Sequence, residues 1–491
     1  MSPGPHEPAG VPPRREATVL CSVRGALEGH VAGILASAPD LNVTRRCADV
    51  AELLAASASG LGMVAVVSGD LVGLDRAAVA ALHTDGVQVI GILDTADDRQ
   101  VERMAALGVD AVLDAGLVAE TLVSSVRALA GAAPARGEGS SSWSGTDALD
   151  EDTWRTQGGL APAGVPSAPG KPARRGRVVA VWGPTGAPGR STIALNLASE
   201  IVATVTVRRP FLGGRSRSSS PDASSEGGSS QTALLVDADT YAGSLAQITG
   251  MLDESSGIAA ACRAAGQGVL DPVVLARLTP EIAPRLRVLS GIARASRWPE
   301  VSEVALDVVW DGCRQVADWT VVDCGFSVER DEMLSYDTRA PQRNGATLSA
   351  LRAADVVVVV GGADPVGVHR LVRALDDLRE CGAADHAERV VVVNRVRASA
   401  TGPHPATALR DALYRYASVN DAIHVPDDQG TCDGALLAGR TLAEQAPTSA
   451  VRRAVRELAG RVRAAGEPSD RTEPGPHVDD ATARQARPVA H

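Results

Sequence analysis

Lysine is almost absent from this sequence of 491 residues, because Lys171 is the single lysine among 48 basic side chains and all the others are arginines. Any function that requires a lysine must therefore use Lys171 or an arginine in its place. Aromatic residues are also scarce, at 2% of the chain. The apolar fraction of 45% and the charged fraction of 22% are nevertheless ordinary for a soluble globular protein.

Segments that would indicate export or a membrane span are missing. No apolar run approaches the roughly 18 residues of a membrane-spanning helix. The opening residues, MSPGPHEPAG, have no basic segment followed by an apolar one, so we expect no signal peptide. The seven cysteines are scattered, odd in number and without a CxxC pair. This pattern predicts reduced thiols in the cytosol, with neither a metal site nor a disulfide framework.

The composition changes along the chain predict two ordered domains, which the length also favours. Residues 1–16 and 466–491 are rich in proline or polar residues and are predicted to be disordered, and residues 135–176 are predicted to form a flexible linker. Ordered patterns fill 17–134 and 177–465. Within the second, 209–231 contain twelve Ser or Gly among 23 residues and predict a disordered insertion. That insertion is either a regulatory loop or, more simply, a tolerated surface insertion.

The first ordered region alternates short apolar runs with helical periodicity. We predict strands at 18–22, 42–46, 63–67, 87–92 and 111–113, and helices at 27–37, 50–56, 77–82, 99–106 and 119–129. Five β/α units predict a doubly wound parallel sheet of flavodoxin-like type. The pattern resembles a response-regulator receiver domain.

The residues that a receiver uses for phosphotransfer are not at the expected places. The resemblance implies an acidic pair after the first strand, a phosphoacceptor Asp after the third and a Lys after the fifth. This sequence has Ser22-Val23, Ser68 and Asp114-Ala115 there, and Asp70 lies two residues beyond the acceptor position. Without the acidic pair a Mg²⁺ ion would have too few oxygen ligands. We therefore expect a pseudo-receiver that contacts other proteins and transfers no phosphate.

The second ordered region opens with a candidate phosphate-binding loop, in the segment VVAVWGPTGAPGRSTIALNLASE. A buried strand at 178–182 leads into a Gly/Pro loop, and a helix with apolar positions every four residues follows. This order predicts a cradle in which backbone N–H groups and a helix N-terminus face an anion. We assign the loop as Gly183, Gly186, Ala187, Pro188 and Gly189, followed by Arg190 for the outer phosphates, Ser191 for Mg²⁺, and Thr192. The alternative is a glycine-rich turn that caps an ordinary helix.

Polar residues at the ends of three later strands support the same site. Asp237 and Asp239 follow a buried strand, Asp323 ends another, where an acid of Walker-B type contacts Mg²⁺, and Asn394 ends a third, where its amide can read the adenine edge. Each residue alone could be a helix cap or a solvated loop residue. Together, after a phosphate loop, they predict one crevice at the carboxyl edge of a parallel sheet.

With these motifs, residues 177–465 resemble the MinD/ParA superfamily of ATPases, whose loop reads KGGxGKTT. The resemblance implies a P-loop fold, ATP and Mg²⁺ as ligands, Arg190, Asp239 and Asp323 as catalytic residues, and Ser191, Asp237 and Asp323 as Mg²⁺ ligands. It places Gly183, Gly186, Ala187, Pro188, Gly189, Arg190, Ser191, Thr192 and Asn394 at the nucleotide. A pseudo-receiver before such a domain resembles the CpaE/TadZ branch, which helps to localise pilus assembly.

Two departures from the family loop predict slow chemistry. Arg190 takes the place of the phosphate-binding lysine and keeps its charge, but its longer planar group is not equivalent to a compact ammonium. Thr185 takes the place of the signature lysine that reaches a dimer partner's nucleotide, and it has no charge. We therefore expect an ATP-binding localisation switch or scaffold for pilus or secretion assembly with weak or absent hydrolysis. The alternatives are an active ATPase in septum-site determination or chromosome partitioning, and a purely structural interaction protein.

The expected partners are proteins of the secretion, pilus or division machinery, bound through the receiver-like domain, and the resemblance also implies a nucleotide-dependent homodimer. The predicted helix at 449–464 has a basic face but no aromatic anchor, so we expect it to pack on the ATPase core rather than bind a membrane directly. The net charge of −11 argues against DNA as a partner. The protein is expected in the cytoplasm, where partners could recruit it to the membrane or pole.

Overall fold

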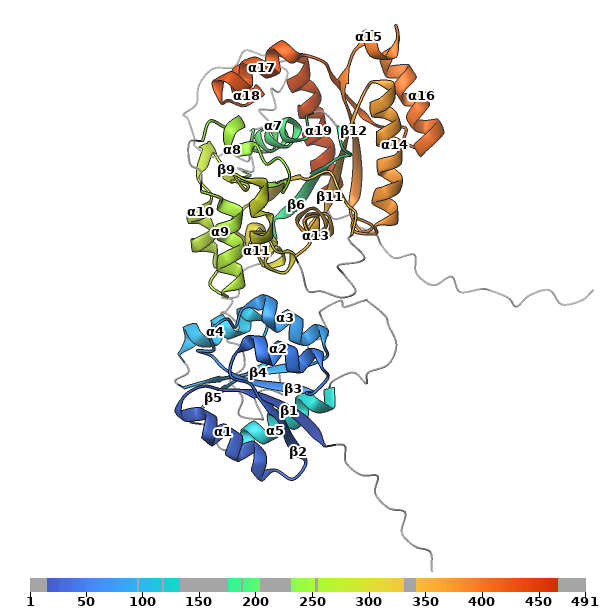
Figure 1. Cartoon of the computed structure of the whole chain (residues 1–491). Helices are drawn as coiled ribbons and strands as arrows, with labels where there is room; N and C mark the ends of the chain where they lie inside the picture. Colours follow the sequence, from blue (N-terminus) through green and yellow to red (C-terminus); the bar gives the residue numbers. More distant parts are fainter. Residues whose placement is uncertain are drawn as a thin grey trace, which may run out of the picture.

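The computed structural model describes residues 16–94, 97–116, 119–132, 175–186, 189–203, 231–251, 255–330 and 341–466. These residues form two domains, each built on its own sheet, and Figure 1 shows the first in blue to cyan and the second in green to red. The predicted disordered ends, linker and insertion lie almost wholly outside the described residues, as do Ala187 and Pro188 of the loop.

The first domain is a parallel five-stranded sheet in the order β2-β1-β3-β4-β5. Its strands are β1 (Ala17–Ser22), β2 (Leu41–Arg46), β3 (Val64–Ser68), β4 (Gln88–Leu93) and β5 (Ala111–Asp114), and its helices are α1 (Ala26–Ser37), α2 (Val50–Ala58), α3 (Arg76–Thr84), α4 (Asp98–Leu107) and α5 (Ala119–Ala132). Buried residues of α2, α3 and α4 form a core on one face, and those of α1 and α5 form a core on the other.

Aspartates define where three of these helices begin. The side chains of Asp49, Asp75 and Asp97 each accept a hydrogen bond from a backbone N–H three residues further on, at the start of α2, α3 and α4. Such caps satisfy donors that the first turn of a helix leaves unpaired. The sequence therefore fixes each loop-to-helix junction locally.

The second domain is an eight-stranded sheet in the order β13-β12-β11-β6-β10-β7-β9-β8. Its strands are β6 (Arg177–Trp182), β7 (Ala233–Ala238), β8 (Glu281–Ala283), β9 (Leu286–Leu289), β10 (Trp319–Cys324), β11 (Val356–Gly362), β12 (Glu388–Val396) and β13 (Ile423–Pro426). All pairings are parallel except that of β8 with β9 at one edge. The α/β fold with parallel sheets is thus confirmed, and β8 is an antiparallel addition that the periodicity did not predict.

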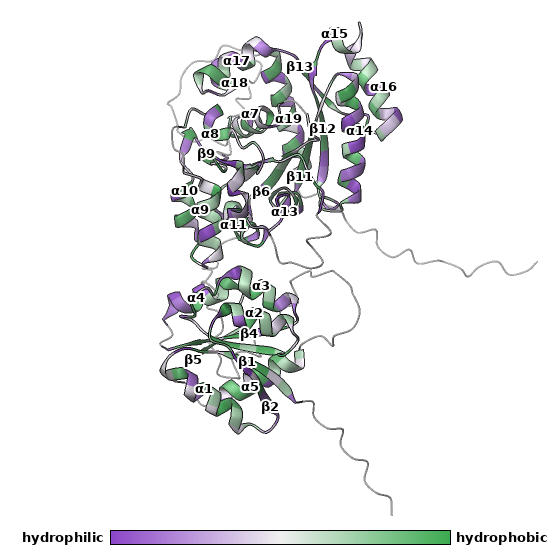
Figure 2. Ribbon diagram, viewed as in Figure 1, coloured by the Kyte–Doolittle hydropathy of each residue, from purple (hydrophilic) through white to green (hydrophobic). Residues whose placement is uncertain are grey.

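Helices cover both faces of this sheet (Figure 1). They are α7 (Arg190–Val202), α8 (Leu245–Ile248), α9 (Gly257–Gly266), α10 (Pro272–Leu278), the 3₁₀ helix η1 (Ala295–Glu300), α11 (Glu303–Val316), α13 (Gly345–Ala353), α14 (Pro365–Glu380), α15 (Ala398–Thr401), α16 (Pro405–Ala417), α17 (Gln429–Ala438), α18 (Leu442–Gln445) and α19 (Ala450–Gly466). One core packs α9, α11, α13 and α14 on the sheet, and the other packs α7 and α19. Figure 2 shows that the central strands are hydrophobic along their length, as strands buried on both faces must be.

The two domains meet where α3 and α4 of the first approach α9 and α11 of the second (Figure 1). Arg103 on α4 donates hydrogen bonds to the carbonyl of Gly69 in its own domain, at 3.0 Å, and to the carbonyl of Gln267 in the other, at 3.2 Å. Gly268 lies so close that a Cβ there would be 2.7 Å from the carbonyl oxygen of Arg103. A single arginine therefore links both domains.

None of the helices in the described part of the chain has both the length and the apolar character that a membrane span needs. All seven cysteines are free thiols. Burial raises the pKa of several of them, to about 12 for Cys262 and for Cys313. These thiols therefore stay protonated at neutral pH and act as small apolar side chains.

Candidate functional site

The candidate site lies at the carboxyl ends of β6, β10 and β7, which are neighbours in the sheet. In this register Asp323 of β10 pairs with Val181 of β6 on one side and with Asp237 of β7 on the other. The loop that follows β6 and the acids that end β10 and β7 therefore meet at one edge. Parallel sheets characteristically bind ligands in this position.

The loop after β6 relies on two glycines in the left-handed region. Gly186 has φ +71° and Gly189 has φ +85°, which other residues adopt only with strain. Gly189 is the N-cap of α7, so the first backbone N–H groups of this 13-residue helix open toward the loop. Such an N-terminus attracts an anion through its free donors and through the helix dipole.

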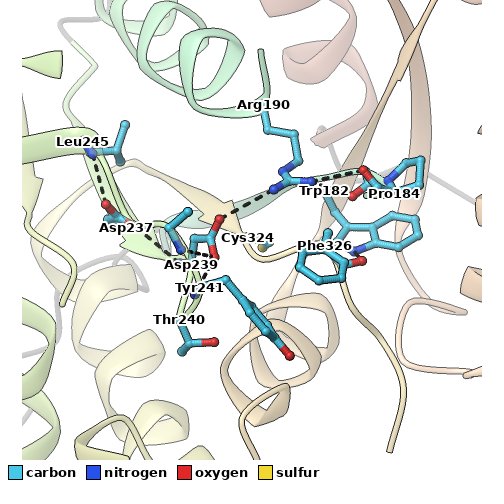
Figure 3. Close-up of polar contacts among 12 residues, drawn as sticks. Trp182, Pro184, Arg190, Asp237, Asp239, Thr240, Tyr241, Leu245, Cys324 and Phe326 are labelled. Carbon is cyan, nitrogen blue, oxygen red and sulfur yellow. Dashed lines mark hydrogen bonds and ion pairs between the residues drawn. The ribbon is translucent and has the colours of Figure 1, made fainter. Parts of the chain in front are cut away.

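Arg190, the first residue of α7, is turned back onto the loop (Figure 3). Its Nη1 donates to the carbonyl of Gly183 at 3.0 Å and to that of Pro184 at 3.2 Å, and its Nη2 lies 3.5 Å from Oδ2 of Asp239. The guanidinium is only 15% exposed. The guanidinium that the sequence predicts to bind phosphates is therefore held by one acid and two carbonyls in this structure.

Asp239 is fixed by the turn that follows β7. Its Oδ1 accepts from the backbone N–H of Tyr241 at 2.8 Å and of Ala242 at 3.2 Å, while Oδ2 faces Arg190. The side chain is 7% exposed. An acid so bound has a defined direction, which positioning of a water or phosphate would require.

Asp237 is buried and points away from the loop toward α8 (Figure 3). Its oxygens accept from the backbone N–H groups of Leu245 at 3.0 Å and of Asp239 at 3.2 Å. Burial raises the pKa of Asp237 to about 6, although these hydrogen bonds oppose the rise. The structure thus gives this carboxylate backbone partners that order the start of α8.

Asp323, unlike Asp237, has no backbone N–H groups bound to its carboxylate in the described part of the chain. It is 1% exposed, and neither carboxylate oxygen has a hydrogen-bond partner among the described residues. Burial raises the pKa of Asp323 well above its usual range and the charge of Asp237 raises it further, whereas the nearby Ser191 hydroxyl, a donor short of full hydrogen-bond geometry, and the charge of Arg190 lower it. A buried carboxylate without a partner is costly unless a cation or donor satisfies it. The orphaned oxygens, with the Ser191 hydroxyl nearby, fit Mg²⁺, which prefers oxygen ligands.

The described residues contain no group of three or more His, Cys, Asp or Glu side chains that could hold a metal on its own. A Mg²⁺ ion at Asp323 would therefore depend on water and phosphate oxygens for its other ligands. That is how Mg²⁺ usually binds beside nucleotides.

Asn394, near the end of β12, contacts the glycine loop after β6. A Cβ at Gly189 would lie 2.5 Å from its Nδ2, so the two residues are in contact. Next to them is a small cavity between α7, the β13 end and α17, and it is lined among others by Thr192, Asn394, Pro426, Asp427 and Cys432.

An aromatic cluster that the sequence pattern did not predict lies beside Asp239. The rings of Tyr241 and Phe326 are 4.8 Å apart, and the Trp182 indole donates to the Phe326 carbonyl (Figure 3). The guanidinium of Arg343 lies 3.8 Å from the centre of the Tyr241 ring. With aromatic residues at 2% of the chain, this concentration is unusual. The position of Tyr241, two residues after Asp239, was the one feature of the sequence that could have indicated this cluster.

At the carboxyl edge of the first domain, the residues at the three positions that a receiver would use form local hydrogen bonds. Ser22 donates to the carbonyl of Cys47, Ser68 accepts from the backbone N–H of Arg24, and Asp114 accepts from the N–H of Gly116. The serines are buried and hold neighbouring loops together. Asp114 likewise serves a turn of its own loop, and the assignment of this domain as a pseudo-receiver stays a prediction.

The basic helix α19 packs on the core of the second domain, as predicted, but its arginines are not simply solvated. Arg452 and Arg456 bind the buried carboxylate of Glu200 on α7, and Arg463 donates to the carbonyls of Glu200 and Ile201. Glu200, as the partner of these arginines, was not predictable from the sequence pattern. These arginines anchor α19 to α7, the helix that begins at the glycine loop after β6.

The structure therefore brings together Gly183, Gly186, Gly189, Arg190, Ser191, Thr192, Asp237, Asp239, Asp323 and Asn394 at one sheet edge. Their individual roles in binding and catalysis stay predictions.

Comparison with known proteins gives no match to a family model and none to a curated protein. Among solved structures, the chain is similar to a ParA family ATPase from Chlorobium tepidum, at 17% identity over 58% of this chain and 99% of that one, with a TM-score of 0.44. It is also similar to the cell division ATPase MinD of Pyrococcus furiosus, at 15% identity over 59% and 99%, with a TM-score of 0.42. A Cyanothece McdA(D38A)–ATP complex has 15% identity over 59% and 98%, with a TM-score of 0.42.

Proposed function

We propose that this chain is an ATP-binding protein of MinD/ParA type, in the CpaE/TadZ-like branch, that acts as a localisation switch or scaffold with weak or absent hydrolysis. The observation that carries the proposal is the orphaned carboxylate of Asp323. It lies at the end of a buried strand, next to Ser191 of a helix that opens on a glycine loop. A Mg²⁺–nucleotide complex would supply both the missing cation and the anion that this site lacks.

The role we propose for each residue follows from its place in the site. The N–H groups at the start of α7 would hold the phosphates, Ser191 and Asp323 would hold Mg²⁺, and Asn394 would face the base beside the small cavity. Bound Mg²⁺ would neutralise charge on the phosphate oxygens. Asp239, directed by two backbone N–H groups, would orient a water molecule.

Slow hydrolysis follows from the charges of the loop. Arg190 is bound to Asp239 and two carbonyls, so it must give up these partners to serve the phosphates. Thr185, exposed in the same loop, contributes no charge. Phosphoryl transfer depends mainly on positioning and on neutralising charge, so both features favour binding over turnover.

The cellular role we propose is assembly of pilus or secretion machinery, with protein partners bound through the receiver-like domain and a nucleotide-dependent homodimer. The protein would be cytoplasmic and would reach the membrane or pole through its partners. We do not expect it to bind DNA or membrane directly, because three arginines of α19 are bound to α7. The alternative is an active ATPase in septum placement or chromosome partitioning.

Isothermal titration of the full chain with ATP in the presence of Mg²⁺ tests the proposal. We expect heat of binding for the wild type and none, or at least tenfold weaker binding, for Asp323→Asn, because the Mg²⁺ ligand is lost. Asp311→Asn, an exposed acid on α11, is the matched control and should bind normally. Absence of binding at millimolar ATP would refute the proposal. Turnover that is abolished in Arg190→Ala and Asp239→Ala would favour the active ATPase.

A further inference from the structure

A second arginine touches the phosphate loop from outside it. Arg370 lies on α14, and its Nη1 is so close to Gly186 that a Cβ there would lie 2.3 Å from this nitrogen. The residue is exposed, and the structure gives it no hydrogen bond or ion pair with any described residue. A full positive charge is therefore placed against the loop without an anion to balance it.

The fold explains why this side chain is there. Strand β11, which leads into α14, is the neighbour of β6, which leads into the loop. Two glycines let α14 approach the sheet closely, since a Cβ at Gly361 would lie 2.6 Å from the Leu371 side chain and a Cβ at Gly367 would lie 2.7 Å from the Gly362 carbonyl. Leu371 is fully buried against the strand, and this packing holds the preceding residue, Arg370, at the loop.

Near Gly186, the other described charged or loop residues do not offer an unpaired cation to an incoming anion, whereas Arg370 does. Arg190 already faces Asp239 and two loop carbonyls, and Thr185 is neutral. A cation beside free N–H donors of a helix N-terminus is electrostatically unfavourable unless an anion binds between them. Gly186 has no side chain that would separate Arg370 from such an anion.

We propose that Arg370 binds the terminal phosphate of a nucleoside triphosphate, as a cation supplied in cis from α14, and thereby makes the site prefer the triphosphate over the diphosphate. This inference rests on the proposed nucleotide binding and adds a residue that determines specificity. A planar guanidinium can donate two parallel hydrogen bonds to phosphate oxygens. A triphosphate presents one more negatively charged group at the outer end of the chain than a diphosphate, so the arginine acts mainly on the triphosphate.

The test is the ratio of affinities for ATP and ADP, measured with fluorescent analogues of both in the presence of Mg²⁺. We expect Arg370→Ala to weaken ATP binding about tenfold, which corresponds to the loss of one charge-assisted hydrogen bond, and to change ADP binding less than twofold. Arg370→Lys should recover part of the loss, because it keeps the charge but not the planar geometry. The matched control is Arg373→Ala, an exposed arginine one turn further along α14, which should leave both affinities unchanged.

Each outcome separates this inference from the proposed function. If the wild type binds neither nucleotide, the proposed function fails and this inference fails with it. If the wild type binds ATP and Arg370→Ala binds it equally well, only the inference about Arg370 is overturned. Equal ATP affinity combined with a lost ATP-dependent dimer would place Arg370 at a protein contact instead, and would also overturn it. Equal weakening of ATP and ADP would show a general role in the loop and would contradict the preference for the triphosphate.

Discussion

At the scale of single residues, the most informative side chain is Asp323, because its burial costs stability that a ligand could recover. A carboxylate with no hydrogen-bond partner in the interior favours its protonated form, which is why its pKa is raised. Nucleotide sites can retain such a cost when function requires it. The same reasoning gives a test without any nucleotide.

We predict that Asp323→Asn raises the melting temperature of the free protein by a few degrees at pH 8. An acid whose folded pKa is above its unfolded value of 3.8 binds more protons when folded, so stability falls as the pH rises from 3.8 through the folded pKa. The amide imitates the protonated acid and removes this loss. The gain should therefore be small at pH 4 and grow toward pH 8 in thermal unfolding scans.

The exposed Asp311→Asn variant is again the control and should show no such growth with pH. A melting temperature of Asp323→Asn below that of the wild type at pH 8 would mean that the carboxylate has a stabilising partner, and would contradict the reading of this site.

At the scale of secondary-structure elements, the two ends of α7 have different surroundings. Its N-terminus opens on the glycine loop, while Glu200 near its C-terminus binds Arg452 and Arg456 of α19. The side chain of Glu200 is 2% exposed. A buried carboxylate bound by two guanidinium groups is a strong constraint, and its loss leaves the arginines without a partner.

We predict that Glu200→Gln lowers the free energy of unfolding by about 2 kcal/mol, because Arg452 would keep a poorly solvated charge without a balancing acid. Urea denaturation measures the loss. Glu457→Gln, an exposed acid on α19, should change stability by less than about 0.5 kcal/mol. A Glu200→Gln variant as stable as the wild type would show that the ion pairs of Glu200 orient α19 without adding to the free energy of unfolding.

The elements also show what the sequence could and could not predict. The five β/α units of the first domain and the strands carrying Asp237, Asp323 and Asn394 were predictable, because buried parallel strands are continuous apolar runs. Strand β8 was not, because three residues at an edge have too little pattern. Arg370 and Glu200 could not be predicted either, since the residues that they contact are distant in sequence and only the packed helices α14 and α19 bring them there.

At the scale of the whole molecule, the contact between the two domains combines polar groups with the packing of α3 against α9 and α11. Arg103 donates to a carbonyl in each domain, and Gly268 approaches the backbone of α4. Each domain has its own apolar cores on both faces of its own sheet. The domains should therefore fold independently, and a small change can loosen their contact without unfolding either one.

We predict that Arg103→Ala increases hydrogen–deuterium exchange severalfold in α3 and α9, the helices that face each other across the contact, while the central strands keep their protection. Arg99→Ala, an exposed arginine at the start of the same helix, is the control and should leave exchange unchanged. Unaltered exchange in both helices of Arg103→Ala would show that apolar packing alone maintains the contact.

The ion pairs of both domains have one further consequence, for handling the protein. In the described residues their cations are guanidinium groups, with His83 as the one exception, and no lysine amine takes part. Reagents that acylate amines would thus find only Lys171 and the chain's amino terminus, both outside the described residues. The protein could be attached to a sensor surface or a dye through these amines while the glycine loop after β6, α14 and α19 keep their native chemistry.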